Sequence, residues 1–216
     1  MTKFTAKIGG LATATLFASA LSASAGLIDF TDPSTYTNDG TVASGTVSGV
    51  TWTLTSTPAG QLNNGEVGPG AIGPLAGTVD GFGVSDDEVS SEPPEILTLT
   101  FSNSVEITVA YFLHLFISPN DEDNFETAHL FGASGNDSFD AQEQAASEAA
   151  PGVGFGAFET SVTGTVFTFV PDPSNDDIGF ADFALAGLEV TEVPLPAGFL
   201  LLGAALGGLG LARRRK

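Results

Sequence analysis

The stretch ILTLTFSNSVEITVAYFLHLFI, residues 96–117, carries the most regular hydrophobic pattern in the chain. Residues 96–101 alternate large apolar side chains with threonines, which predicts a strand with one buried face. Residues 105–117 begin with the same alternation and then become apolar on both faces, as in a strand that is covered on both sides. Because Ser102-Asn103-Ser104 separates the two halves, we expect a hairpin at the centre of a sheet.

Outward from this hairpin, further short stretches predict strands separated by loops rich in Gly and Pro. The last of them changes its alternation near Gly187, which predicts a β-bulge there. Residues 141–146 form the one stretch whose composition suits a helical turn. The remaining expected strands cover residues 46–55, 126–131, 155–158, 162–170 and 178–190. About eight strands without a βαβ rhythm predict an all-β fold, a single jelly-roll-like β-sandwich.

The charge of the chain is distributed in an extreme way. All 26 Asp and Glu residues fall between Asp29 and Glu192, and all 6 Lys and Arg residues lie outside that region. The central region is therefore more acidic than the overall net charge of −20, and it would repel nucleic acid and anionic membrane surfaces. The chain has 17 Phe residues, most of them in this region, and they argue for a buried core rather than for disorder. Because Cys is absent, disulfides and thiol chemistry are excluded.

The N-terminus has the features of a secretory signal peptide. Lys3 and Lys7 precede an apolar or small-residue stretch at residues 8–21, and Ala23-Ser24-Ala25 fits a cleavage site of the A-x-A type. We expect residues 1–25 to be removed, so that the exported chain begins at Gly26 and its acidic domain covers residues 26–192.

The C-terminus combines a proline motif, an apolar segment and a cationic end. Val193-Pro194-Leu195-Pro196-Ala197 precedes an uncharged run at residues 197–212, and Arg213-Arg214-Arg215-Lys216 ends the chain. About 16 residues make a helix of about 24 Å, short of a hydrocarbon core of roughly 30 Å. The prolines nevertheless fix where the helix starts, and the cations favour a cytoplasmic end. We expect one transmembrane helix over residues 197–212.

This order of motif, helix and basic end resembles the sorting tails of the PEP-CTERM type, in the variant with a Val-Pro-Leu-Pro-Ala motif (VPLPA-CTERM). The resemblance covers residues 193–216. It implies processing at the motif by an exosortase, a membrane protease or transpeptidase, during export. The runs at residues 81–88, 95–101 and 180–186 are also similar to β-sandwich ectodomains found with such tails. A simple single-pass tail anchor is the alternative.

The residues offer little support for catalysis. His114 and His129 are the two histidines, and both lie in apolar strand-like segments that favour a packed or hydrogen-bonded structural role. There is no Gly-x-Ser-x-Gly elbow and no glycine-rich phosphate loop before a helix. Glycoside hydrolysis needs a pair of carboxylates at a suitable separation. Among 26 Asp and Glu residues any two could meet that condition, so their presence does not indicate this activity. We therefore expect a protein that is not an enzyme and requires no cofactor.

Calcium is the ligand that the acidic loops favour, because it takes six to eight oxygen ligands from carboxylates, amides and carbonyls. Asp86-Asp87-Glu88 is the first candidate, since it lies just before the expected central hairpin. The loops at residues 121–124 and 172–177 are further candidates, and solvated acidic turns are the alternative for all three.

Together these features predict an exported protein that is anchored first in the inner membrane and then reaches the cell surface or extracellular matrix. Its expected partners are an exosortase, the membrane through the C-terminal helix, and an exopolysaccharide. A carbohydrate-binding module is the first alternative, although sugar stacking would have to use Trp52, Tyr36 or Tyr111, two of which lie in expected core strands. A secreted hydrolase is the second alternative.

Overall fold

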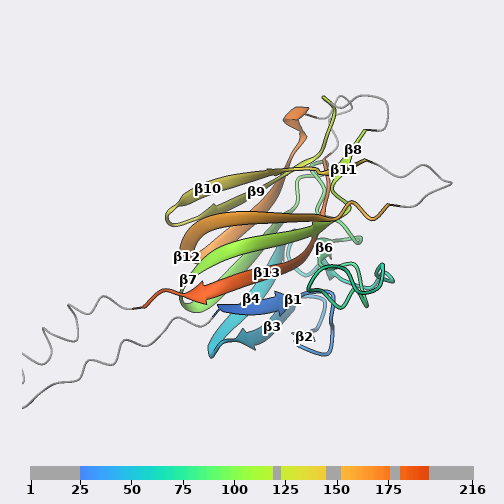
Figure 1. Ribbon diagram of the computed structural model, residues 1–216. Helices are drawn as coiled ribbons and strands as arrows, with labels where there is room; N and C mark the ends of the chain where they lie inside the picture. The colour runs from blue at the N-terminus through green and yellow to red at the C-terminus, as the bar shows by residue number, and fades with distance from the viewer. Residues whose placement is uncertain (1–24, 119–122, 145–151, 176–180, 195–216) are drawn as a thin grey trace, which may run out of the picture.

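The computed structural model describes residues 25–118, 123–144, 152–175 and 181–194, and these form a sandwich-like arrangement of antiparallel sheets (Figure 1). The prediction of an all-β sandwich is confirmed. The strands are β1 (Ala25–Asp29), β2 (Thr37–Asn38), β3 (Val42–Val47), β4 (Val50–Thr57), β5 (Leu62–Asn63), β6 (Gly83–Val84), β7 (Ile96–Leu113), β8 (Phe116–Ile117), β9 (Thr127–Gly132), β10 (Gly135–Asp140), β11 (Glu143–Gln144), β12 (Gly156–Asp172) and β13 (Ala184–Glu192), with one 3-10 turn, η1 (Pro173–Asn175).

Nine strands hydrogen-bond in a continuous series. Seven of them follow the order β10-β9-β12-β7-β4-β3-β2. The remaining two branch from this order, because β13 pairs with the second half of β7 and β1 pairs with β13. Two small pairs, β5 with β6 and β8 with β11, lie beside this series. In the described part of the chain, no helix has the length and hydrophobicity needed to span a membrane. The expected helix at residues 197–212 lies outside the described residues.

The expected central hairpin is wrong, because residues 96–113 form the single long strand β7. Its first half pairs with β4 and its second half with β13, while β12 pairs along both halves. The expected turn at residues 102–104 is the place where β7 changes neighbour. The Ser102 hydroxyl accepts the amide of Thr51, and the Ser104 carbonyl accepts the amide of Val193. The polar residues therefore mark the place where β7 leaves β4 and begins to pair with β13.

The opposite error occurs at residues 46–55, where a single strand was expected. Ser48 and Gly49 have φ values of 48° and 85°, and they form the turn between β3 and β4. Two successive positive φ angles are typical of the tight turn of a hairpin. The expectation of strand structure is correct for the second part of this range, where Val50, Trp52 and Leu54 alternate with threonines in β4 and are buried.

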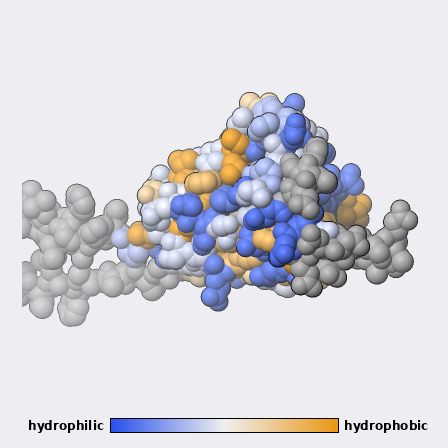
Figure 2. Space-filling view, turned by 90° about the horizontal axis from the view of Figure 1, so that it is seen from above, coloured by the Kyte–Doolittle hydropathy of each residue, from blue (hydrophilic) through white to orange (hydrophobic). Residues whose placement is uncertain are grey.

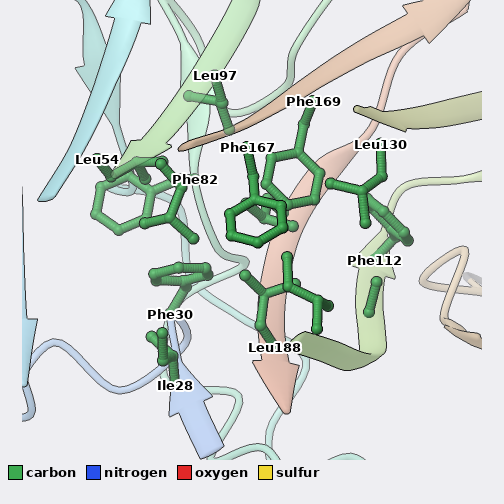
Figure 3. Packing of buried hydrophobic residues seen from close by; sticks show 14 of the residues in the cluster. Ile28, Phe30, Leu54, Phe82, Leu97, Phe112, Leu130, Phe167, Phe169 and Leu188 are labelled. Atoms are coloured by element: carbon green, nitrogen blue, oxygen red, sulfur yellow. The ribbon is translucent and has the colours of Figure 1, made fainter. Parts of the chain in front are cut away.

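The core lies between the layers and is dominated by aromatic side chains. Figure 3 shows Phe30 and Phe82 on one side of this core, Phe167 and Phe169 in its middle and Phe112 on the other side. Each of these five side chains has no exposed surface. Burying a large apolar side chain contributes roughly 1.5–3 kcal/mol, so this cluster is a main source of stability.

A second, smaller cluster explains why the end of β7 is apolar on both faces. Tyr111 and Leu113 point away from the main core and pack with Leu75 from the long loop before β6. Phe155 packs against the same cluster, with its ring stacked on that of Tyr111 at a centroid distance of 6.3 Å. The loop therefore acts as an outer layer over the second half of β7.

The last strand confirms the expected bulge near Gly187. In the pairing of β13 with β7, Leu185 lies opposite Phe112 and Gly187 opposite Tyr111, so Ala186 is the extra residue. A Cβ atom at Gly187 would lie 2.7 Å from the Leu75 side chain and 2.9 Å from the Ile28 carbonyl oxygen. The bulge, together with a glycine at position 187, lets the outer loop and β1 approach β13 closely. The helical turn considered at residues 141–146 is wrong for Glu143 and Gln144, which form β11.

Candidate functional site

Acidic side chains gather around His114 at the end of the sandwich where β7 ends and β13 begins. We call Asp80, Asp87, Glu88, Glu126 and Asp182 the acidic cluster. They come from the loop around β6 and from the residues just before β9 and β13. Figure 1 shows β6, β8 and β11 at this end of the long strands, and the start of β1 beside the tip of β13 at the other.

His114 lies at the centre of the cluster because the chain turns sharply there. Its φ angle is 60°, and the amides of His114 and Leu115 donate to the carbonyls of Val153 and Gly154 at 2.8 and 3.1 Å. A Cβ atom on Gly154 would lie 2.5 Å from the Leu115 nitrogen. The glycine therefore permits the close approach that holds His114 in a left-handed conformation.

Asp80 is positioned by the loop that runs along the beginning of β13. Gly81 has a φ angle of 110°, and Phe82 exchanges two 3.0 Å hydrogen bonds with Leu185. Further along, the amide of Val89 donates to the Phe183 carbonyl at 2.7 Å. These backbone contacts fix the loop on the sandwich, and they place Asp80 and Asp87 on either side of β6.

One ring nitrogen of His114 and one carboxylate oxygen each from Asp80 and Asp87 lie within 4.8 Å of one another. The His114 Nδ1 atom is 3.9 Å from Asp87 Oδ2 and 2.8 Å from Glu88 Oε1. Hydrogen bonding to Glu88 raises the pKa of His114; burial opposes that effect, and the charges of Asp80 and Asp87 add to it. His114 is thus held in place by carboxylates on more than one side.

Asp80 differs from the other carboxylates because it is buried without a partner. It is 2% exposed, and within the described residues neither carboxylate oxygen accepts a hydrogen bond. Burial raises its pKa above the ordinary value. Glu95 is nearly as buried, but its oxygens accept hydrogen bonds from the Ser90 amide at 2.9 Å and the Ser85 hydroxyl at 3.1 Å. An unpartnered buried carboxylate is costly unless a proton or a cation compensates it.

Glu126 and Asp182 extend the cluster behind Glu88. Glu126 accepts the amide of Phe116 at 2.6 Å and hydrogen-bonds with Asp182, which also hydrogen-bonds with Glu88. Burial, reinforced by the neighbouring charge of Asp182, raises the pKa of Glu126 to about 9. Burial and the charge of Glu88 raise the pKa of Asp182 to about 6. Glu126 therefore retains its proton near neutral pH.

The structure brings together only part of the site predicted from the sequence. Asp87 and Glu88 belong to the cluster, whereas Asp86 is exposed and its carboxylate accepts the amide of Glu88 at 3.3 Å. Asp80, Glu126 and Asp182 were missed. Asp80 and Asp182 are single carboxylates within apolar runs, and such isolation is a sequence signal of burial. Both histidines are hydrogen-bonded as expected, His129 to Asp172 at 2.9 Å.

The other predicted site residues lie mostly outside the described residues. This applies to Ala23 of the signal cleavage site, to residues 195–197 of the motif and to the basic end, residues 213–216. It also applies to parts of the acidic loops at residues 121–124 and 172–177. Ala25, Gly26, Val193 and Pro194 are described, at the end of the sandwich far from His114.

The aromatic residues considered for sugar stacking are in the interior. Trp52 is 3%, Tyr111 6% and Tyr36 9% exposed, so none of these rings offers a free face. Figure 2 shows a face of the molecule on which hydrophobic residues form small groups among hydrophilic ones. Phe131 is the most exposed aromatic residue among the large hydrophobic side chains of the described region, at 42%, and its ring stacks on His129.

No known family model and no curated protein matches this sequence. One solved structure is similar, described as CpGH89CBM32-5 from Clostridium perfringens in complex with GalNAc-β-1,3-galactose. The match has a TM-score of 0.26 and 18% sequence identity, and covers 64% of this chain and 94% of that one.

Proposed function

We propose that this protein is a non-catalytic, exported component of the cell surface or extracellular matrix, sorted by its C-terminal tail. The signal peptide directs export, the helix at residues 197–212 holds the chain in the inner membrane, and an exosortase acts at Val193-Pro194-Leu195-Pro196-Ala197. We also propose that the sandwich is of the jelly-roll type, as expected from the sequence. No Lys or Arg occurs between Asp29 and Glu192, which makes nucleic acid an unsuitable partner.

The observation that supports the proposal is the position of the two ends of the domain. Ala25 lies opposite Thr191 in the antiparallel pair of β1 and β13. The expected cleavage site and the sorting motif therefore leave the sandwich side by side. β13 has 9 residues, and at about 3.3 Å per residue it separates this end from the acidic cluster by roughly 30 Å. A tail held at the membrane would present the acidic cluster outward.

Mass spectrometry of the exported protein tests the proposal. We expect the mature form to begin at Gly26 and to lack Arg213 to Lys216 with most of the apolar run. Replacing both Pro194 and Pro196 by Ala should leave membrane insertion intact and block this processing. An intact C-terminus in cells that contain a matching exosortase would refute sorting at the motif. The C-terminal segment would then be a simple tail anchor.

Glycan binding is the second candidate function, favoured by the exposed ring of Phe131. An aromatic face beside polar side chains is the usual platform for a sugar, and here the Phe131 ring stacks on His129, which hydrogen-bonds with Asp172. A polysaccharide pull-down with wild type and Phe131→Ala tests this role. Retention that depends on Phe131 would identify a glycan binder, and equal behaviour of the two proteins would favour a plain structural component.

A further inference from the structure

We propose that the acidic cluster contains a binding site for a divalent first-row transition metal ion, such as Zn²⁺ or Mn²⁺, with Asp80, Asp87 and His114 as its protein ligands. This inference is independent of the sorting tail. It concerns a site at the opposite end of the sandwich, and it rests on the positions, burial and charges of the three ligands.

The ligand atoms already have a spacing close to that of a metal site. They lie within 4.8 Å of one another. Ligands at about 2.0–2.2 Å from an ion are separated from one another by at most about 4.4 Å. Small side-chain rotations would therefore close the site, and Asp87 and His114 retain some exposure that allows such movement. Water can complete the coordination from the solvent side.

The unpartnered carboxylate of Asp80 is a second observation that points to a ligand. Both of its oxygens are buried, and within the described residues neither has a hydrogen-bond donor. The nearby Glu95 shows that the fold can supply donors to a buried carboxylate, since Ser85 and Ser90 satisfy its oxygens. At Asp80 the open positions face Asp87 and His114 instead. A cation at this point would replace the missing donors.

The sequence leaves few other sources of positive charge. Between Asp29 and Glu192 the chain has no Lys or Arg, so a salt bridge with either residue is impossible within the domain. His114 is one imidazole among the five carboxyl groups of the acidic cluster. Compensation of this charge must come from protons or from a cation taken up from solution, and the three converging ligands favour the cation.

The imidazole ligand determines the class of metal. Calcium prefers oxygen ligands alone, whereas imidazole with carboxylates suits zinc and related ions. Glu88 holds one ring nitrogen, since its carboxylate lies 2.8 Å from His114 Nδ1. We therefore assign Nε2 as the nitrogen that would bind the metal, and a carboxylate that orients a ligating histidine through its other nitrogen is common in such sites. This proposal differs from the calcium site predicted at Asp86-Asp87-Glu88 in two of its three residues and in its metal.

Metal titration of the full-length protein, purified in mild detergent and stripped with a chelator, tests the proposal. Zn²⁺ or Mn²⁺ should bind with one ion per chain, measured by elemental analysis after desalting. At about a hundredfold excess over Kd it should raise the melting temperature by about 5–10 °C. Ca²⁺ and Mg²⁺ at the same concentration should have a much smaller effect, which separates site binding from general screening of the acidic surface.

Three variants and a matched control assign the ligands. Asp80→Asn and His114→Gln should each abolish the metal-dependent rise in melting temperature. Glu88→Gln should weaken binding by about 10–100-fold, as expected for a residue that orients a ligand. His129→Gln removes the other histidine, which pairs with Asp172 at 2.9 Å, and it should leave metal binding unchanged.

A variant that fails to fold would not obscure the result, because the metal-free melting curve is recorded for each protein. Asp80→Asn without metal should be at least as stable as wild type, since it removes an unpartnered buried carboxylate. Metal-dependent stabilisation that survives in Asp80→Asn and His114→Gln would overturn the site. Stabilisation by Ca²⁺ alone would overturn the assignment to a transition metal.

Discussion

The Nδ1 atom of His114 lies 2.8 Å from Oε1 of Glu88, and this contact joins the end of β7 to the turn that follows β6. It is the main cause of the raised pKa of His114. In Glu88→Gln, in the presence of chelator, the pKa of His114 should fall, because the hydrogen bond to a charged acceptor is lost. An NMR titration of the two histidines measures this change. An unaltered His114 titration would show that Glu88 does not hold the ring in solution.

The pH dependence of stability should be the reverse of that of most proteins. The pKa of Glu126 rises from 4.5 to about 9 and that of Asp182 from 3.8 to about 6, and the pKa values of Asp80 and Glu95 are also raised by burial. The folded state then binds more protons than the unfolded state. The stability that these groups contribute is fully present below their unfolded pKa values. It is lost as the pH rises through their folded pKa values, between about pH 4 and pH 9.

Thermal melts at low salt with chelator test whether stability falls as the pH rises. We expect the full-length protein to melt at least a few degrees higher at pH 5 than at pH 8, since 1 kcal/mol corresponds to about 2–4 °C in a chain of this size. Salt at about 0.15 M, with a Debye length near 8 Å, should narrow the difference. Glu126→Gln should narrow it as well. Greater stability at pH 8 would mean that carboxylates with lowered pKa values, such as Asp32 and Asp39, dominate.

Truncation of Phe112 should be among the most damaging single changes. Its ring has no exposed surface and contacts the rings of Phe139, Phe158, Phe169 and Phe183. Phe112→Ala should cost about 3–5 kcal/mol of unfolding free energy, from lost burial and the remaining cavity. Val166→Ala, at a site that is 48% exposed, is the control and should cost well under 1 kcal/mol. Denaturant unfolding compares the two, and similar midpoints would contradict the assigned core.

Gly81→Ala should destabilise the loop that carries Asp80. A Cβ atom at Gly81 would lie 2.6 Å from the Leu185 carbonyl oxygen, and φ is 110°. Gly40 has a φ of 80° but no atom within 4 Å of its Cβ position, so Gly40→Ala measures the effect of backbone conformation alone. Gly81→Ala should cost at least about 1 kcal/mol more than this control, as expected for strain and displacement in a packed region. Equal losses of unfolding free energy in Gly81→Ala and Gly40→Ala would show that the loop does not pack closely on β13.

The alternation of apolar residues predicted which side chains are buried better than it predicted where strands end. Leu97, Leu99 and Phe101 are buried as expected, yet the following polar residues continue the strand β7 rather than forming a turn. Small polar residues can form a turn or lie within a strand, and the outcome depends on partners distant in sequence, here Thr51 and Val193. At Ser48 and Gly49, conversely, a turn of two residues interrupted a pattern that continued on both sides of it.

The candidate site was only half predictable for a similar reason. Asp87 and Glu88 were selected because they stand in a run of acidic residues. Asp80 and Asp182 are single residues, and their meeting with His114 depends on the hydrogen bonds that lay the loop around β6 along the start of β13. Local composition contains no information about such long-range pairing. Their isolation in apolar segments signals burial, but it does not indicate which residues they meet.

The pairing of β13 on both of its edges has a mechanical consequence. β13 lies between β7 and β1, antiparallel to each, and it runs from the acidic cluster to Val193. A load applied between a ligand at the cluster and a tether at Val193 would act along the strand, across its interstrand hydrogen bonds. In this shear geometry many bonds must break together, whereas peeling from one end would break them one at a time. A protein held at Val193 would therefore resist drag on its outer end much more strongly than one held through a terminal strand that unzips.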